Sequence, residues 1–129
     1  MLKVLICDDD LITRKLLSRT VESLGHTAIN ASSGKKAWDI LMDNSDISLL
    51  ITDIAMPDLD GRELIKTIRG NESVAKLPII IVSGVVGYNE IREILELGAS
   101  RFMPKPLDLS ELKKYIEALI VGKESLGSA

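Results

Sequence analysis

The chain places polar side chains directly after four of its apolar runs. These are the side chains of Asp8, Asp9, Asp53, Ser83 and Lys105. Three carboxylates that share a small site raise each other's pKa unless a cation is present. Oxygen ligands with room for water favour Mg²⁺, a lysine ammonium suits a phosphoryl oxygen, and a hydroxyl can donate to another. Together they are the groups required for phosphoryl transfer onto an aspartate.

These side chains can meet only if the runs before them are strands of one parallel sheet. Residues 47–51 form an apolar run broken only by Ser48, which is typical of a strand buried on both faces of such a sheet. The carboxyl ends of parallel strands lie at one edge of the sheet, where ligands bind. Asp53 follows this run and is therefore the first candidate for chemistry.

Hydrophobic periodicity predicts strands that alternate with helices five times along the chain. The predicted strands are residues 4–7, 27–31, 47–52, 79–82 and 101–103. The predicted helices begin near residues 11, 34, 61, 88 and 109, the last with Asp108 or Ser110 as its N-cap. This alternation is typical of an α/β fold, here a single-domain, doubly wound, five-stranded parallel sheet flanked by five helices.

Length and composition indicate one domain with a sizeable core, since 46% of the 129 residues are hydrophobic. The net charge is −3 and no basic stripe is apparent, so we expect no direct binding of nucleic acid. No apolar run is long enough to span a membrane. The single cysteine, Cys7, fits a cytoplasmic location. We expect a domain over residues 1–121 and a flexible tail or linker start over residues 122–129.

The residues at these strand ends resemble those of the receiver domain of two-component response regulators. The resemblance covers about residues 2–120 and implies a flavodoxin-like sheet with the strand order 2-1-3-4-5. It rests on four motifs that are weak singly and specific together: Asp8-Asp9, Asp53 with Met56-Pro57 and Asp60-Gly61, Ser83-Gly84, and Lys105-Pro106.

The resemblance implies that Asp53 is the phosphoacceptor of a site that binds Mg²⁺, with Mn²⁺ as a substitute. Asp9 and Asp53 would ligate the metal directly, together with the backbone carbonyl of Ala55. Asp8 would act mainly through a metal-bound water. These roles follow from the resemblance and not from spacing alone.

The resemblance also implies roles for residues near the ends of the last two strands. Lys105 would pair with the phosphoryl group and the phosphoacceptor, and the Lys105–Pro106 bond would be cis. Ser83 would hold the phosphoryl group after transfer and shift with it. Phe102 would be the aromatic switch residue, without the hydroxyl of the more frequent tyrosine. The switching surface would run from Tyr88 to Ile120.

The predicted function is acceptance of a phosphoryl group from the phosphohistidine of a histidine kinase or a histidine phosphotransfer protein, in a two-component system or phosphorelay. Such a domain is not an enzyme beyond catalysing its own phosphorylation and dephosphorylation. The predicted partners also include an unidentified output domain or downstream protein, and a second copy in a phosphorylation-dependent homodimer. Neither a membrane nor nucleic acid is among them.

Three alternative functions use the same residues. Aspartate-nucleophile phosphohydrolases often carry a second carboxylate two residues after the nucleophile, where this chain has Ala55. A flavodoxin-like flavin binder would need a phosphate-binding loop after the first strand, where residues 8–10 would repel the phosphate. A receiver-like interaction module would signal by protein contact without being phosphorylated.

Several polar residues near the motifs have purely structural interpretations. Asp10 favours a helix N-cap, and Asp58 and Asp60 favour turns. His26 follows a glycine at a helix end, where we expect it at the surface. Trp38 is predicted to pack, half-exposed, on its helix.

Overall fold

A computed structural model describes residues 2–56, 58–84 and 87–127, with side chains up to residue 120. Pro57 of the predicted loop motif lies outside the described residues. Strands and helices alternate along the described chain: β1 Lys3–Cys7, α1 Leu11–Ser23, β2 Thr27–Ala31, α2 Gly34–Asp43, β3 Ile47–Thr52, α3 Gly61–Arg69, β4 Ile79–Ser83, α4 Tyr88–Leu97, β5 Arg101–Pro104 and α5 Leu109–Gly127. Each predicted strand and helix is present.

The strands form one parallel sheet in the order β2-β1-β3-β4-β5, which confirms the predicted order and fold class. Because every strand runs in the same direction, all their carboxyl ends lie at one edge. Backbone hydrogen bonds continue past the strands there: Asp53 N–H donates to Cys7 O at 3.0 Å, and Asp8 N–H donates to Ala31 O at 3.2 Å. The loops that follow neighbouring strands therefore start side by side.

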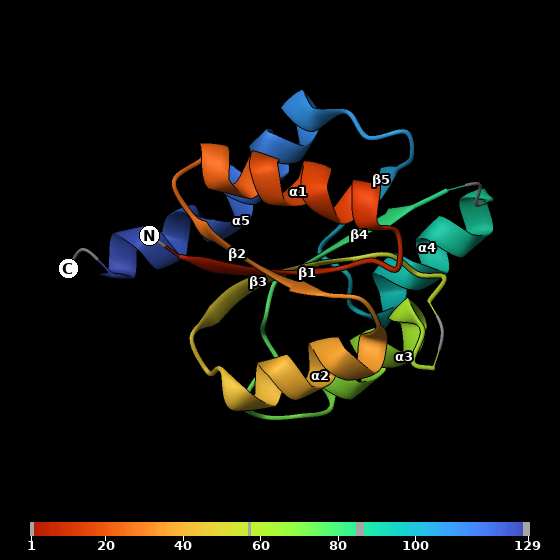
Figure 1. The fold of residues 1–129 in the computed structure, drawn as a ribbon. Coiled ribbons are helices and arrows are strands. Elements are labelled where there is room, and N and C mark those ends of the chain that lie inside the picture. The colour runs from red at the N-terminus through yellow and green to blue at the C-terminus, as the bar shows by residue number, and fades with distance from the viewer. Residues whose placement is uncertain (1, 57, 85–86, 128–129) are drawn as a thin grey trace.

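Helices cover both faces of the sheet, with α1 and α5 on one face and α2, α3 and α4 on the other (Figure 1). Every residue of β3 is buried, as the apolar run predicted. Within it, Leu50 packs toward α2 and α3 while Leu49 and Ile51 pack toward α1 and α5. Each fully buried leucine or isoleucine side chain contributes about 1.5–3 kcal/mol to folding, so this central strand is a rigid base for Asp53.

Side-chain caps begin most of the helices close to where the sequence predicted them. The side chains of Asp10, Ser33, Asp60 and Asp108 each accept a backbone N–H of the following helix. Each such cap satisfies a backbone N–H that has no partner within the helix, and contributes about 1 kcal/mol. Asp108, rather than Ser110, is therefore the N-cap of α5.

Three details differ from the sequence predictions. His26 is buried rather than at the surface, because its Nδ1 accepts the N–H of Leu2 at 3.2 Å where β1 starts. Leu11 and Leu16 of the periodic pattern in α1 are 53% and 39% exposed. The backbone of α5 continues as a helix to Gly127, past the expected end of the domain at residue 121. The flexible tail or linker start over residues 122–129 stays a prediction.

The sequence from residue 122 contains no proline before Gly127, so nothing in it forces the helix to stop earlier. The domain boundary at residue 121 stays a prediction. Trp38 is half-buried and Cys7 is fully buried, as expected. No helix of the described chain has the length and apolar character needed to cross a bilayer.

Candidate functional site

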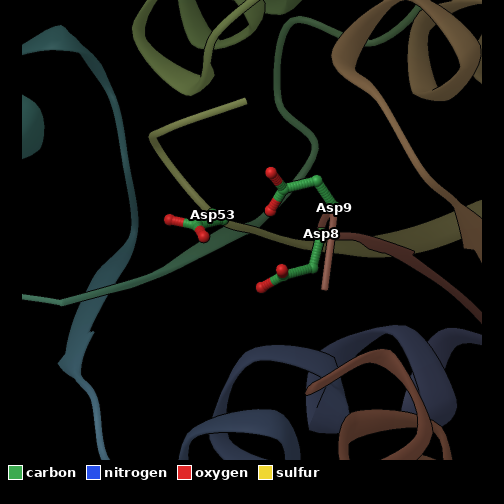
Figure 2. A group of neighbouring side chains, drawn as sticks. All are labelled: Asp8, Asp9 and Asp53. Carbon is green, nitrogen blue, oxygen red and sulfur yellow. The ribbon is translucent and has the colours of Figure 1, made fainter. Parts of the chain in front are cut away.

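Three carboxylates meet at the carboxyl ends of the two central strands. Asp8 and Asp9 follow β1, and Asp53 follows β3, whose Thr52 lies in register with Cys7 of β1. Each residue offers a carboxylate oxygen, and these oxygens lie within 4.8 Å of one another (Figure 2). The parallel pairing of β1 with β3 therefore assembles the acidic cluster that the sequence predicted.

Lys105 brings a cation into this cluster from beyond β5. Its Nζ lies 2.9 Å from Asp53 Oδ2 and 3.1 Å from Asp8 Oδ2, and donates a hydrogen bond to each. The backbone holds the lysine in place, since Lys105 N–H donates to Ser83 O at 2.7 Å. The Lys105–Pro106 bond is cis, as the resemblance implied.

The Asp53 side chain is oriented by the loop that follows it. Its Oδ1 accepts the backbone N–H of Ile54 at 2.6 Å and that of Ala55 at 3.4 Å, while Oδ2 accepts from Lys105. The residue is only 7% exposed. A carboxylate held at both oxygens loses little further freedom when it reacts, which favours attack in one fixed direction.

The loop after Asp53 is packed closely against the start of α3, and this contact requires a glycine. A Cβ on Gly61 would lie 2.6 Å from Asp53 O and 2.8 Å from Ile54 Cα. The Gly61 N–H also donates to Ile54 O at 2.8 Å. The predicted Asp60-Gly61 pair therefore does two jobs, since Asp60 caps α3 and Gly61 lets the helix approach the Asp53 backbone.

Asp8 is fully buried, and its environment works against its negative charge. Burial raises the pKa of Asp8 above its usual value, and the negative charge of Asp53 raises it further. Hydrogen bonds from Asp10 N–H and from the Lys105 ammonium lower the pKa of Asp8, but they offset only part of this increase. Asp8 Oδ1 accepts Asp10 N–H at 2.9 Å. An ionised Asp8 therefore gains from any further cation placed beside it.

Lys105 remains a cation in this site. Burial lowers the pKa of Lys105, but the hydrogen bonds to Asp53 and Asp8 raise it by more, so its pKa lies above the usual value. One ammonium faces three carboxylates, however, and the cluster keeps a net negative charge.

The donor set fits a small hard divalent cation. All three side-chain ligands are carboxylates, which suit Mg²⁺, and Asp9 is exposed, so water ligands have access. Asp9 and Asp53 are the predicted direct ligands, and Ala55 lies in the exposed part of the loop two residues after Asp53. Its carbonyl as a ligand stays a prediction.

The two predicted switch residues lie outside the carboxylate cluster. Ser83 ends β4, is 6% exposed, and pairs in register with Pro104, the residue before Lys105. Phe102 lies in the middle of β5 opposite Ile81, half-buried, and packs against the cluster of apolar residues on the α4 side of the sheet. Ser83 therefore lies at the edge of the site. Phe102 lies on the neighbouring strand and packs against the core.

One residue that supports the site had no signal in the sequence. Arg14 of α1 donates from Nη1 to the backbone carbonyl of Asp8 at 2.6 Å. The guanidinium therefore fixes the β1 end through a main-chain atom, which no side-chain motif could reveal. The sequence shows only that an arginine lies in the first turns of the helix that follows Asp8 and Asp9, which does not by itself predict a hydrogen bond to the main chain.

Comparison with known proteins agrees with the geometry. A family model described as the response regulator receiver domain matches residues 4–117. The chain is 33% identical over 129 residues to the chemotaxis protein CheY homolog of Campylobacter jejuni, covering 99% of each protein. It is 31% identical over 120 residues to chemotaxis protein CheY1 of Helicobacter pylori, covering 92% of this chain and 97% of that protein.

Solved structures lead to the same family. The response regulator receiver protein of Pseudomonas putida is 35% identical and superposes with a TM-score of 0.85 over 91% of this chain and 96% of its own. The receiver domain protein of Clostridium thermocellum is 25% identical, with a TM-score of 0.87 over 98% and 99% of the two chains. Receiver domains are signalling modules of two-component systems and not metabolic enzymes. The chain belongs to the response regulator receiver domain family.

Proposed function

We propose that Asp53 accepts a phosphoryl group from the phosphohistidine of a histidine kinase or a histidine phosphotransfer protein. The observation that carries this proposal is the Lys105 ammonium, which bridges Asp53 and Asp8 at 2.9 Å and 3.1 Å beside Asp9. A nucleophilic carboxylate, a partly buried cation and two further carboxylates in one place match phosphoryl transfer better than any other reaction.

The transfer is an in-line displacement at phosphorus. A carboxylate oxygen of Asp53 forms the new bond to phosphorus, the bond from phosphorus to the histidine nitrogen breaks, and its electron pair returns to the imidazole. The hydrogen bonds from Ile54 and Ala55 orient the carboxylate for this attack. The charged Lys105 stabilises the negative charge on the transferred group.

Asp8, Asp9, Asp53 and the carbonyl of Ala55 are the groups that would hold Mg²⁺ or Mn²⁺. A bound divalent ion supplies positive charge opposite the phosphoryl oxygens and offsets the carboxylates. The raised pKa of Asp8 and the exposure of Asp9 support this assignment, because the single Lys105 ammonium faces three carboxylates and the site is open to water.

The acyl phosphate then changes the surface from Tyr88 to Ile120. Ser83, at the end of β4, donates to a phosphoryl oxygen, and Phe102 on the neighbouring β5 changes rotamer as Ser83 moves. The pairing of Ser83 with Pro104 and the bond from Lys105 N–H to Ser83 O support this route. The changed surface binds an output domain, a downstream protein or a second phosphorylated copy.

Intact-mass spectrometry with a small phosphodonor tests the acceptor role directly. The chain is incubated with acetyl phosphate and Mg²⁺, and we expect a gain of one phosphoryl group. The Asp53→Asn variant, which keeps the size of the side chain but not its nucleophilicity, should gain none. Equal behaviour of the two proteins would refute the proposal.

The same preparations separate the alternative functions. Continuous phosphoester hydrolysis that is lost in Asp53→Asn would favour a phosphohydrolase. Absence of both a phosphoryl adduct and Mg²⁺ binding would favour a module that signals by contact alone. A phosphorylated histidine phosphotransfer protein, used as donor in place of acetyl phosphate, tests the proposed source of the phosphoryl group.

A further inference from the structure

Two hollows lie beside the carboxyl-terminal part of β2, one between α1 and α2 and the other along α1. One, of about 410 Å³, extends from Arg14 and Asn30 to Lys36 of α2. The other, of about 500 Å³, extends from the same two residues along α1 to Lys15 and Arg19. The linings of the two hollows share Arg14 and Asn30, and together we call the hollows the β2 groove. Figure 1 shows β2 passing between α1 above and α2 below.

The free edge of β2 offers backbone hydrogen-bonding groups: Asn30 lines both hollows, and Ala28 precedes it on the same strand outside their lining. Thr27 N–H donates to Leu2 O, and Ala31 O accepts Asp8 N–H, so these two residues point toward β1. In a parallel strand the direction alternates with a period of two residues. Ala28 and Asn30 therefore direct their N–H and C=O groups away from β1, toward the free edge, because β2 is the last strand on that side.

The groove carries an excess of positive charge on an acidic protein. Its lining includes four cationic residues, Arg14, Lys15, Arg19 and Lys36, against Asp39 and Glu22. No ion pair with a carboxylate is recorded for any of the four within the described part of the chain. The chain as a whole has a net charge of −3. Three of the four cations, Arg14, Lys15 and Arg19, lie on α1, and Lys36 lies on α2.

We propose that the β2 groove binds an extended, acidic segment of a partner protein, which adds to the sheet beside β2. The main-chain groups of Ala28 and Asn30 supply hydrogen bonds to the segment, as in other cases of strand addition at a sheet edge. The four cations select an acidic sequence by charge complementarity and attract it over a distance. This surface is separate from the Tyr88 to Ile120 surface that the proposed function uses.

The charge of the groove argues against a second copy of this chain as the occupant. Pairing β2 with β2 of another copy would place the two sets of cations against each other, and positive side chains along an edge oppose such pairing. A nucleic acid would satisfy the charges but not the strand edge, because Ala28 and Asn30 present the alternating donors and acceptors that a peptide backbone matches.

The groove also borders the acidic site through one side chain. Arg14 lines both hollows and donates to Asp8 O at 2.6 Å. A carboxylate of the bound segment can therefore compete for the guanidinium that fixes the β1 end. Binding in the groove does not depend on phosphorylation, so we test it without a phosphodonor.

Nuclear magnetic resonance titration of the ¹⁵N-labelled chain tests the proposal. The probe is a synthetic peptide of alternating glutamate and valine residues, which favours an extended conformation. We expect saturable shifts of the Ala28 and Asn30 amides, slower hydrogen exchange at both, and weaker binding as salt is added. A peptide with lysine in place of glutamate should not bind.

Variants separate the charges from the strand edge. Lys15→Glu combined with Arg19→Glu should weaken binding about tenfold or more. The matched control, Lys66→Glu with Lys76→Glu, makes the same charge change at exposed positions outside both the groove and the Tyr88 to Ile120 surface, and should leave binding unchanged. Asn30→Pro removes the outward N–H and should weaken binding while the charges remain.

Several outcomes would overturn the proposal. These are no shift at β2, equal affinity for the acidic and basic peptides, equal effects of the groove and control reversals, or tighter binding of a single-stranded oligonucleotide at the same amides. If Asn30→Pro fails to fold, the comparison of the two double charge reversals decides between the outcomes.

Discussion

The ends of β1 and β3 both place a buried carboxylate in the same site, but they hold it in different ways. Asp53 after β3 is oriented by the N–H groups of its own loop, and Gly61 closes that loop against α3. Asp8 after β1 is fully buried with a raised pKa. The β3 end is therefore shaped for a reaction in a fixed direction, whereas the β1 end is unfavourable for charge until a cation arrives.

Removing the cation that both ends share should have the largest effect. Lys105→Gln leaves Asp8 and Asp53 close together without the ammonium that lies 2.9 Å from Asp53. We expect the rate of phosphorylation by acetyl phosphate to fall by about 10²–10³-fold, as when a group that stabilises transition-state charge is lost. Time-resolved intact-mass measurement gives this rate. The rate should fall less in Lys105→Arg, which keeps the charge. An equal fall in the two variants would show that the size and shape of the lysine side chain matter, and not its charge.

Filling the space at Gly61 tests the shaped β3 end. Gly61→Ala puts a methyl group 2.6 Å from Asp53 O, so the backbone must shift. We expect the free energy of unfolding to fall by about 1–3 kcal/mol, as for other overpacked sites, measured by urea denaturation. Gly84→Ala is the control, since a Cβ there has no neighbour within 4 Å. Equal losses in the two variants would show that the contact at Gly61 is not tight.

Removing the charge at the β1 end should stabilise the metal-free protein. Asp8→Asn keeps the side-chain size and an oxygen for Lys105 but has no charge to bury, so we expect a higher free energy of unfolding than in the wild type at neutral pH without metal. Added Mg²⁺ should stabilise the wild type more than the variant, because the variant lacks one acidic ligand. Thermal denaturation with and without Mg²⁺ measures both effects. A variant less stable than the wild type without metal would contradict this view of the β1 end.

The pH dependence follows from the direction of the same pKa shift. The pKa of Asp8 is higher in the folded chain than in the unfolded chain, so the folded chain binds more protons between the two values. The contribution of Asp8 to stability therefore falls as the pH rises from the unfolded value, about 3.9, through the raised folded value. The difference between wild type and Asp8→Asn, measured by denaturation at several pH values without metal, should grow in that direction. If the difference in stability between the two proteins became smaller as the pH rose, the pKa of Asp8 would be lowered by folding and the prediction would be wrong.

The smallest effect is expected from the side chain that holds the β1 end through its backbone. Arg14→Ala removes the hydrogen bond to Asp8 O, and we expect Mg²⁺ affinity to fall a few-fold and stability to fall by about 1 kcal/mol. Calorimetric titration with Mg²⁺ measures the affinity. Arg19→Ala, on the same helix, is the control and should leave the affinity unchanged. If the two variants bound Mg²⁺ with equal affinity, Arg14 would have no role in supporting the site.

The sequence predicted the fold and the meeting of Asp8, Asp53 and Lys105 because these rest on local patterns. Apolar runs gave the strands, parallel order gave the common edge, and the residues directly after each run had to lie there. Helix caps such as Asp10 and Asp108 were equally local, whereas Asp60, predicted as a turn former, is the N-cap of α3.

The features that the sequence did not predict depend on contacts between distant elements. The bond from Arg14 to a main-chain carbonyl leaves no side-chain pattern, and the burial of His26 depends on the start of β1. The close approach at Gly61 was visible only as a turn former. The positive excess of the β2 groove lies on α1, which contributes three cations against Glu22, and only the fold shows that these side chains line a hollow beside β2.

Lys105 serves two carboxylates with one ammonium. Under the proposed function this sharing would couple the phosphorylation of Asp53 thermodynamically to the binding of a divalent ion. A phosphoryl group on Asp53 adds negative charge that draws the ammonium away from Asp8, so Asp8 gains more from a divalent ion. By reciprocity, a divalent ion beside Asp8 releases the ammonium to the phosphoryl group and stabilises the modified state by the same factor. Under the proposed function the site would therefore respond to two inputs, because the divalent ion and the phosphoryl group would each favour the binding of the other.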